Sequence, residues 1–307
     1  MDPLPASLDS LELRQRRAHT GALELHVVEA GAGPPVLLLH GFPEFWYSWR
    51  HQLGPLAAAG FRAVAPDLRG YGQSDKPRAV GDYAIEHLVA DVRALVLELG
   101  GEPVTLVGHD WGGALAWEVA LRCPELVRRL AILNAPHPLS MQRALRTWRQ
   151  LRKSWYMLFF QLPRLPERWL LQGESRRMRS MLRRDPVRPD AFAPEDIERY
   201  VEAIQRPGAA RGAIHWYRAA LRRLPGAARA PWTPVEAPVL VIWGEADRYL
   251  GPELAQPPAR WAPRAEVVRL PAASHWVQVD AAARVSELLV EFARGERDGA
   301  PHPAERP

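Results

Sequence analysis

The chain has 307 residues, of which 47% are hydrophobic and 24% are charged, and its formal net charge at pH 7 is +5. This length and composition are typical of a globular protein with one large or two modest domains, and they exclude a disulfide-stapled miniprotein and a disordered chain. A single cysteine, Cys123, forms no internal disulfide, so we expect a reducing compartment, the cytoplasm.

The N-terminal residues and the apolar runs indicate neither export nor a membrane span. Residues 1–5 lack the basic stretch and apolar run of a signal peptide. The longest apolar runs, such as residues 34–39, have the length of a strand and not the roughly 20 residues that a membrane helix needs. We therefore expect a protein without a membrane span.

Short apolar runs alternate with helical patterns from residue 22 onward. The runs are continuous, which is typical of strands in a parallel sheet that helices cover on both faces. Apolar residues at helical spacing predict one long helix from residue 85 to residue 99, ending before two glycines. The predicted strands are residues 23–28, 36–40, 61–65, 104–107, 130–133, 239–243 and 267–270. This pattern predicts an α/β fold with a parallel sheet.

The alternation stops after Pro136 and resumes at Pro238. Met141, Leu145 and Trp148 fall on one helical face, and a densely aromatic stretch follows. We interpret this segment as a helical lid over the carboxyl edge of the strands, where open α/β sheets bind ligands. The predicted domains are a first core part, a lid, and a second core part with a frayed C-terminal tail, over residues 1–136, 137–232 and 233–307 respectively.

Basic residues are concentrated in the predicted lid. Residues 137–232 hold 20 lysines and arginines against 8 aspartates and glutamates. The arginine bias of the whole chain fits the codon preference of a G+C-rich genome, but a basic segment also attracts anions. No nucleic-acid fold motif accompanies it, so we expect no nucleic-acid partner and consider instead that the lid steers anionic substrates.

The segment after the strand at 104–107 has the pattern of a nucleophile elbow. In residues 108–113, Gly-His-Asp-Trp-Gly-Gly, small residues on either side of the central position permit the sharp turn that projects its side chain. The central residue is Asp110, where a serine is common. The alternative interpretation is a helix N-cap, a position that also favours aspartate.

Two further polar residues follow later strands. Asp247 comes after strand 239–243, and His275 comes after strand 267–270. Nucleophile, acid and histidine in this order match the α/β-hydrolase triad. Taken alone, Asp247 is equally a turn residue and His275 a solvated histidine, but three such residues, each after a strand, favour the triad.

On these motifs the chain resembles the α/β-hydrolase-fold epoxide hydrolases over about residues 20–294. The resemblance implies the α/β-hydrolase fold, a mostly parallel central sheet flanked by helices, with an inserted helical lid or cap. It also implies an oxyanion hole formed by the backbone N–H groups of Phe42 and Trp111, and a cis bond between Phe42 and Pro43. The matching motifs are His40-Gly41-Phe42-Pro43-Glu44, Asp67-Leu68-Arg69-Gly70-Tyr71-Gly72-Gln73-Ser74-Asp75, Gly108-His109-Asp110-Trp111-Gly112-Gly113, Gly244-Glu245-Ala246-Asp247 and Ser274-His275-Trp276.

An aspartate nucleophile favours a substrate that reacts at an alkyl carbon. Attack there forms an ester that water then cleaves, whereas attack on an acyl group forms a mixed anhydride without evident advantage. We expect water deprotonated by His275 to attack the Asp110 carbonyl, and the oxyanion hole to stabilise the tetrahedral charge. Asp247 then holds the histidine tautomer and stabilises its cation.

Opening an epoxide produces an alkoxide that needs a proton donor, and the resemblance implies that two lid tyrosines donate it. Tyr156 and Tyr217 lie in local sequences similar to the family's lid motifs. The alternative for each is a packed aromatic whose hydroxyl binds backbone. The sequence therefore predicts an epoxide hydrolase that forms a vicinal diol through a covalent ester on Asp110, hydrolysed by water that His275 activates.

Asp110 itself disfavours a serine-type esterase, and three other functions fit these residues less well than epoxide hydrolysis. A haloalkane dehalogenase shares the aspartate nucleophile, but dehalogenases commonly have asparagine where Phe42 stands or carry further N–H donors in the lid. Fluoroacetate dehalogenases typically have arginine at the position of Trp111 and the triad acid at that of Asn134. A non-catalytic ligand receptor is expected to lack triad members, and all three are present.

Two residues beside the triad and the expected partners complete the prediction. We interpret His109 as structural, and Glu44 either as a residue that organises water near the histidine or as a surface-loop residue. No metal-ligand spacing or nucleotide fingerprint is present, so we expect no metal and no organic cofactor. Twelve tryptophans favour an apolar pocket for a small apolar epoxide, in a monomer or a homodimer.

Overall fold

A central sheet of eight strands organises the protein in this computed structural model, which describes residues 11–21, 23–222 and 232–297. The strands are β1 (Leu13–Thr20), β2 (Leu23–Ala30), β3 (Pro35–Leu39), β4 (Arg62–Pro66), β5 (Val104–His109), β6 (Val127–Leu133), β7 (Val239–Gly244) and β8 (Ala265–Leu270). Their order across the sheet is β1-β2-β4-β3-β5-β6-β7-β8. Strand β2 pairs antiparallel with β1 and β4, and all other neighbours are parallel. The predicted mostly parallel sheet is confirmed.

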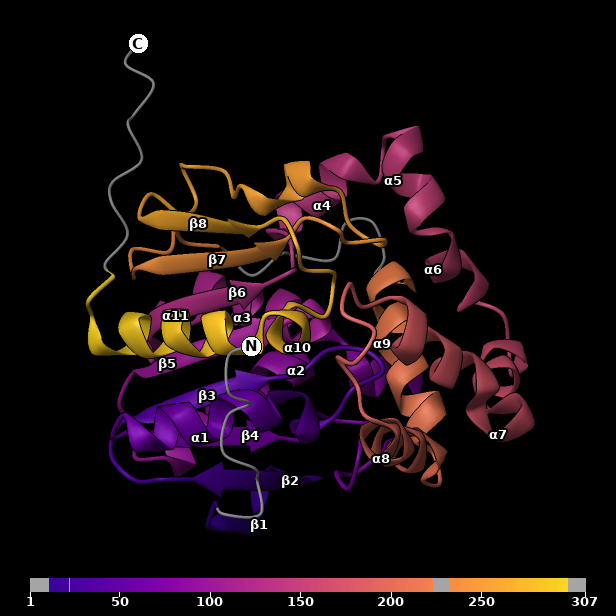
Figure 1. The fold of residues 1–307 in the computed structure, drawn as a ribbon, viewed down its shortest axis with the longest axis horizontal. Helices are drawn as coiled ribbons and strands as arrows, with labels where there is room; N and C mark the ends of the chain where they lie inside the picture. The colour runs from indigo at the N-terminus through magenta and orange to yellow at the C-terminus, as the bar shows by residue number, and fades with distance from the viewer. Residues whose placement is uncertain (1–10, 22, 223–231, 298–307) are drawn as a thin grey trace.

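Helices cover both faces of this sheet, and a separate group of helices lies beyond the carboxyl ends of its strands. Figure 1 shows α1 and α11 in front of the sheet, α2 and α3 behind it, and α5 to α9 to its right. The helices are α1 (Arg50–Ala58), α2 (Ile85–Glu98), α3 (Asp110–Arg122), α4 (Pro138–Ala144), α5 (Trp148–Lys153), α6 (Trp155–Phe159), α7 (Leu165–Arg184), α8 (Pro194–Gln205), α9 (Ala209–Arg222), α10 (Val277–Asp280) and α11 (Ala282–Arg294). None of those in the described part of the chain is long and apolar enough to cross a membrane.

Strand β1 is the one strand that the sequence did not predict. Three of its eight residues are arginines, and most of its residues are exposed or half-buried. It lies at the edge of the sheet, where one side needs no apolar neighbour and charged side chains discourage pairing with other chains. Arg16 of β1 binds Glu29 of β2 at 2.7 Å, so ion pairing accompanies the backbone ladder.

The predicted helical insert is confirmed between β6 and β7, where the described residues form helices α4 to α9 and no strand. Its limits at residues 137 and 232 stay a prediction, because residues 223–231 lie outside the described part. The tail expected to fray also falls largely outside it, at residues 298–307. Residues 1–5, where no signal-peptide pattern was found, also lie outside the described part.

The predicted helical face of Met141, Leu145 and Trp148 is wrong. Helix α4 ends at Ala144, and the Thr147 side chain accepts a hydrogen bond from the backbone N–H of Gln150 at 3.3 Å, which begins a new helix, α5. Trp148 consequently lies 74% exposed instead of packing with the other two residues.

Helix α9 of the lid packs against the core through a close backbone contact. A β-carbon added to Gly212 of α9 would lie 2.5 Å from the carbonyl oxygen of Gly70, so only glycine permits this approach. The Trp216 indole N–H donates to the carbonyl of Arg69 at 3.0 Å. These contacts hold the next residue, Tyr217, over the carboxyl ends of the strands.

The sheet centre is expected to dominate stability. Leu106 in β5 is fully buried, so Leu106→Ala should lower the free energy of unfolding by about 2–5 kcal/mol through lost burial and a residual cavity. Leu97 in α2 is 57% exposed, and Leu97→Ala should change it by less than about 0.5 kcal/mol. Urea denaturation at unchanged m-value compares the pair. Equal effects of the two substitutions would contradict the assigned core.

Candidate active site

Asp110 projects from a strained turn between β5 and α3. Its φ is +49°, a conformation that L-residues rarely adopt. A β-carbon on Gly108 would lie 2.3 Å from the Gly112 carbonyl oxygen, and one on Gly112 would lie 2.2 Å from that of Leu39, so both positions require glycine. The N-cap of α3 is His109, which excludes the N-cap alternative for Asp110.

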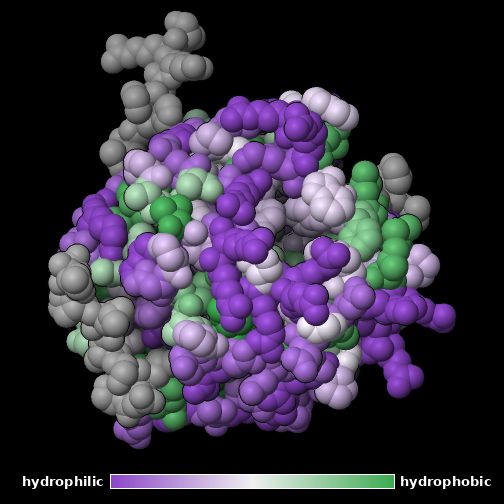
Figure 2. Space-filling model, turned by 45° about the vertical axis from the view of Figure 1, so that its right-hand side comes forward, coloured by the Kyte–Doolittle hydropathy of each residue, from purple (hydrophilic) through white to green (hydrophobic). Residues whose placement is uncertain are grey.

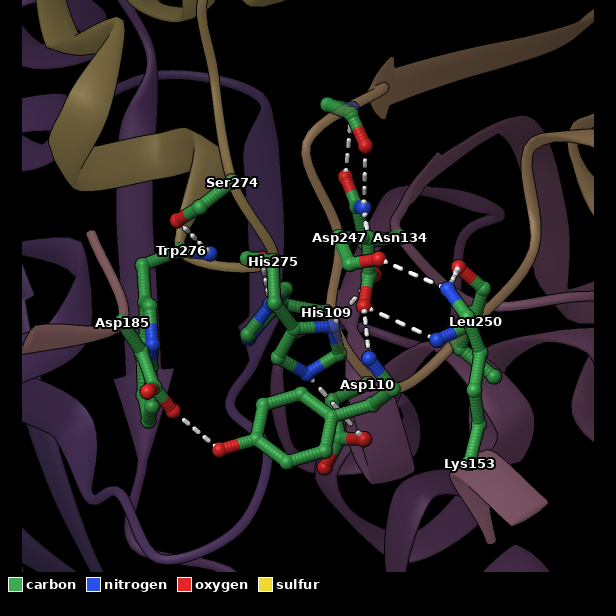
Figure 3. Close-up of polar contacts among 12 residues, drawn as sticks. His109, Asp110, Asn134, Lys153, Asp185, Asp247, Leu250, Ser274, His275 and Trp276 are labelled. Carbon is green, nitrogen blue, oxygen red and sulfur yellow. Dashed lines mark hydrogen bonds and ion pairs between the residues drawn. The ribbon is translucent and has the colours of Figure 1, made fainter. Parts of the chain in front are cut away.

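The three predicted triad residues meet at the carboxyl ends of β5, β7 and β8. His275 Nδ1 lies 2.7 Å from Asp247 Oδ2, and its Nε2 lies 3.5 Å from Asp110 Oδ2. Figure 3 shows the imidazole between the two carboxylates. His275 is 4% exposed, so it is not a solvated histidine. The arrangement places a base beside a nucleophile and an acid behind the base.

Charge stabilises this arrangement. Burial alone lowers the pKa of His275, but the charge of Asp247 and the hydrogen bond to Asp110 outweigh it and raise that pKa well above its usual value. Burial disfavours ionised Asp110, yet the hydrogen bond and charge of His275 lower the pKa of this carboxyl. The pKa of Asp247 is lowered against the same burial cost by the charge of His275. These opposite shifts of the pKa values favour the charged forms of all three groups, a cationic imidazole between two carboxylates.

Asn134 stands where fluoroacetate dehalogenases carry the triad acid, and no other role is predicted for it from the sequence. In the structure its side chain holds Asp247 in place. Its amide nitrogen donates to Asp247 Oδ2 at 2.8 Å, and its amide oxygen accepts from the Gly244 N–H at 2.8 Å. Its φ is +39°, which asparagine tolerates better than most residues. Its position directly after a predicted strand, like those of the triad members, was the signal available for it.

The other carboxylate oxygen of Asp247 accepts hydrogen bonds from the loop after β7, and lid side chains donate hydrogen bonds to the same loop. Asp247 Oδ1 accepts from the backbone N–H groups of Tyr249 and Leu250 at 2.7 and 2.9 Å, so the turn interpretation is also correct. Lys153 Nζ donates to the carbonyls of Asp247 and Leu250 at 2.9 Å each, and the Gln150 amide donates to that of Tyr249 at 2.8 Å.

Glu44 and His109 form a buried layer behind the triad. Glu44 is 2% exposed, so the surface-loop interpretation is wrong. Its carboxylate contacts His109 Nδ1 at 2.8 Å and accepts from the Gln278 amide at 3.0 Å. His109 Nε2 lies 2.8 Å from the backbone oxygen of His275, which agrees with a structural role.

Phe42 and Trp111 flank the nucleophile. The Phe42 N–H donates to Asp110 Oδ1 at 2.8 Å, as expected of an oxyanion donor, and the cis bond between Phe42 and Pro43 is confirmed. Among the described residues, the backbone N–H of Trp111 has no comparable contact with Asp110, and its role as an oxyanion donor stays a prediction. The Trp111 indole packs edge-on against Tyr217, with ring centroids 4.9 Å apart.

The structure brings the two lid tyrosines together above Asp110. The rings of Tyr156 in α6 and Tyr217 in α9 have centroids 5.8 Å apart, and both line a cavity of about 900 Å³ with Asp110 and His275. Burial raises the pKa of both phenols far above the usual value, so each hydroxyl keeps its proton. A second cavity reaches Asp110, Tyr156 and Tyr217 from the side of α2 and α4.

A third tyrosine, which the sequence analysis missed, lies against the histidine. The ring of Tyr249 has its centroid 5.2 Å from that of His275 and 5.9 Å from that of Tyr156. Its hydroxyl donates to Asp185, so this tyrosine packs against the site but its proton is directed away from it. Among the described residues, no group of three or more histidine, cysteine or acidic side chains is placed to hold a metal ion.

Comparison with known proteins places this geometry in context. Residues 34–282 match the alpha/beta hydrolase fold family. The chain is 39% identical over 281 residues to AB hydrolase superfamily protein YfhM of Bacillus subtilis, covering 91% of this chain and 97% of that protein. It is 36% identical over 288 residues to Epoxide hydrolase 4 of Mus musculus, covering 91% and 79%. It superposes on the crystal structure of Bacillus megaterium epoxide hydrolase in complex with an inhibitor with a TM-score of 0.82 and 31% identity, covering 91% and 100%.

Asn134 offers a test of how the acid is held. Asn134→Ala should lower the free energy of unfolding by about 3 kcal/mol, because it removes buried hydrogen bonds and leaves an unsuited residue at positive φ. Asn134→Gly loses the same bonds without the backbone strain and should recover about 1 kcal/mol. Urea denaturation measures both. A glycine variant no more stable than the alanine variant would contradict the assigned strain.

Proposed function

The chain belongs to the epoxide hydrolases of the α/β-hydrolase fold family, and we propose that it forms a vicinal diol from an epoxide and water through an ester on Asp110. The observation that carries the proposal is the shared cavity in which the Asp110 carboxylate faces two protonated lid phenols, Tyr156 and Tyr217. We further propose residues 137–232 as the lid and a small apolar epoxide as the substrate.

In the first step, Asp110 attacks a ring carbon of the epoxide. Its Oδ1 is held by the Phe42 N–H, so Oδ2 is the oxygen that forms the new bond to carbon. The carbon–oxygen bond of the ring breaks, and its electron pair stays on the epoxide oxygen. Tyr156 and Tyr217 donate hydrogen bonds to that oxygen, and one of them transfers its proton. The result is a hydroxyalkyl ester on Asp110 and a tyrosinate.

In the second step, His275 activates water. Ester formation removes the negative charge of Asp110, one of the groups that raise the pKa of His275, so the imidazolium loses its proton more readily. Neutral His275 takes a proton from water, and the resulting hydroxide attacks the ester carbonyl carbon of Asp110. The oxyanion forms on Oδ1 beside the Phe42 N–H, with Trp111 proposed as second donor. Collapse breaks the bond from this carbon to the alkoxy oxygen, which takes the proton of the carboxyl group so formed, and the diol leaves Asp110 as a carboxylate. The proton that His275 released before the attack of water passes through solvent to the tyrosinate and restores the tyrosine.

The alternatives are less well supported by the same site. A departing halide carries no proton and gains little from two phenols, and Phe42 offers no side-chain N–H donor to it. A serine-type esterase needs a serine nucleophile, and this chain has Asp110 at that position. A non-catalytic receptor has no use for a triad with each member within reach of the next.

The tyrosines decide between epoxide and halide chemistry. Wild type should convert trans-stilbene oxide to its diol, and Tyr156→Phe and Tyr217→Phe should each slow single-turnover alkylation by about 100-fold, because each loses a proton donor. Tyr47→Phe is the matched control, since its hydroxyl binds Asp196 away from the cavity. Rates are measured in quenched reactions, by the diol formed from trans-stilbene oxide and by the bromide released from 1-bromobutane. Bromide released from 1-bromobutane with no diol from the epoxide would instead establish a dehalogenase.

The role of His275 has a pH signature. In wild type, hydrolysis of the ester should slow as acid protonates His275, whereas alkylation persists because the pKa of Asp110 is lowered. The ester should therefore accumulate at acid pH, and in His275→Gln at every pH, as a protein mass increased by one epoxide. Asp110→Asn/His275→Gln is the control and should gain no mass. A hydrolysis rate constant independent of pH would remove His275 from this role.

A further inference from the structure

The outer face of the lid exposes a stripe of large apolar side chains. Of the ten large hydrophobic residues that are exposed in the described part of the chain, seven lie between residues 148 and 171. Leu158, for example, is 67% exposed. Six of the seven follow one another at spacings of three and four residues, the period of a helix face. These six, which we call the apolar stripe, are Trp148, Leu151, Trp155, Leu158, Leu162 and Leu165.

At helix α5, the stripe reverses the usual amphipathic pattern of a surface helix. The side of α5 that faces the core carries polar groups. Gln150 and Ser154 are buried and lie within hydrogen-bond distance of each other, and Lys153 donates to the loop after β7. A helix that only covers a core buries its apolar residues and exposes its polar ones. Here the large apolar residues, Trp148 and Leu151, are the exposed ones.

Substrate binding accounts for only part of the apolar stripe. Trp148 and Trp155 border the cavity above Asp110. The four leucines of the stripe line neither of the two cavities that reach Asp110. Exposed apolar side chains that gather in one place without lining a pocket are typical of an interaction surface.

Basic side chains are interleaved with the apolar stripe. Residues 146–168 hold six lysines and arginines against one acid, Glu167, which pairs with the buried Arg218. Figure 2 shows hydrophobic residues, in green, gathered at the right-hand side of the hollowed face, and hydrophilic ones, in purple, around the hollow. Four of the six basic residues are exposed arginines that have no carboxylate of the described chain within ion-pair distance: Arg146, Arg152, Arg164 and Arg168.

We propose that this face of the lid binds to an anionic lipid surface. The tryptophans and leucines of the stripe enter the boundary between headgroups and acyl chains, where such side chains are stabilised, and the arginines bind the phosphates of the headgroups. A second copy of the chain fits the face less well, because a symmetric contact through it brings the arginines of the two copies together.

Sedimentation with lipid vesicles tests the proposal. The probes are vesicles of phosphatidylglycerol and phosphatidylcholine in equal parts, and vesicles of phosphatidylcholine alone. Wild type should bind the anionic vesicles about tenfold more tightly than the neutral ones, and added salt should reduce this difference by screening the headgroup charge. Because the whole chain has a net charge of +5, the binding must also be assigned to this face.

A matched pair of leucines tests the apolar contribution. Leu158→Gln should weaken binding to the anionic vesicles about tenfold, because it removes a side chain that enters the lipid boundary. Leu97→Gln, at a similarly exposed leucine on α2, should leave binding unchanged. An unchanged urea midpoint of unfolding shows that each variant is folded.

A matched pair of double substitutions tests the charge contribution. Arg164→Gln/Arg168→Gln should also weaken binding about tenfold, because two cations that contact the headgroups are lost. Arg93→Gln/Arg128→Gln removes the same charge from exposed positions on α2 and β6, and it should have no such effect. A dependence on net charge alone would instead make the two double variants equal.

Three results would overturn the proposal. The first is equal binding of wild type to the two kinds of vesicle, and the second is binding that each pair of variants affects equally. The third is absence of vesicle binding together with a dimer, seen by sedimentation velocity, that Leu158→Gln dissociates, which would assign the stripe to a contact between two copies of the chain. The proposed function stands in all three cases, because the experiment measures binding and not turnover.

Discussion

The buried imidazole of His275 between the carboxylates of Asp110 and Asp247 is the interaction on which the rest of the site depends. Each ion is costly to bury alone, and each is stabilised by the neighbour that it contacts. Around this row, neutral donors complete the hydrogen bonding, from Phe42 to Asp110 and from Asn134 to Asp247. His109 secures the backbone of the histidine itself. The polar contacts near the nucleophile therefore belong to one connected network.

The reactivity of the nucleophile also depends on the lid. Trp216 binds the core through the carbonyl of Arg69, and Gly212 lies against the backbone of Gly70. Helix α9 is thereby held close to the sheet edge, and Tyr217 reaches the same cavity as Asp110. Burial by neighbouring aromatic rings then keeps the phenols protonated. In the proposed mechanism, the core therefore supplies the triad, and the insert supplies the two tyrosines that donate protons.

The sequence predicted those parts of the fold whose signal is repeated over several residues. Apolar runs identified seven strands, and most of these strands are buried, although β8 at the opposite edge of the sheet is largely half-buried. Strand β1 lacked such a run, since an edge strand rich in arginine is stabilised by its ladder and by ion pairs. The break between α4 and α5 was missed because one threonine cap outweighed the apolar spacing.

At the site, motifs revealed the triad but not the residues that hold it. Glu44 lies in a matching motif and Asn134 lies directly after a strand, but no local spacing indicates which groups these residues or Tyr249 contact. Asn134 contacts a carboxylate 113 residues away, and Glu44 contacts a histidine 65 residues away. Only the packing of the strands brings these pairs together.

Hydrogen bonds from helix α5 to the loop after β7 link the lid to the acid of the triad. The side chains of Lys153 and Gln150 donate hydrogen bonds to three backbone carbonyls of this loop, those of Asp247, Tyr249 and Leu250. Lifting α5 away from the core leaves these carbonyls without their lid donors and loosens the turn that presents Asp247 to His275. The lid thus does more than cover the cavity, because its three donated hydrogen bonds help to fix the position of the carboxylate that contacts His275.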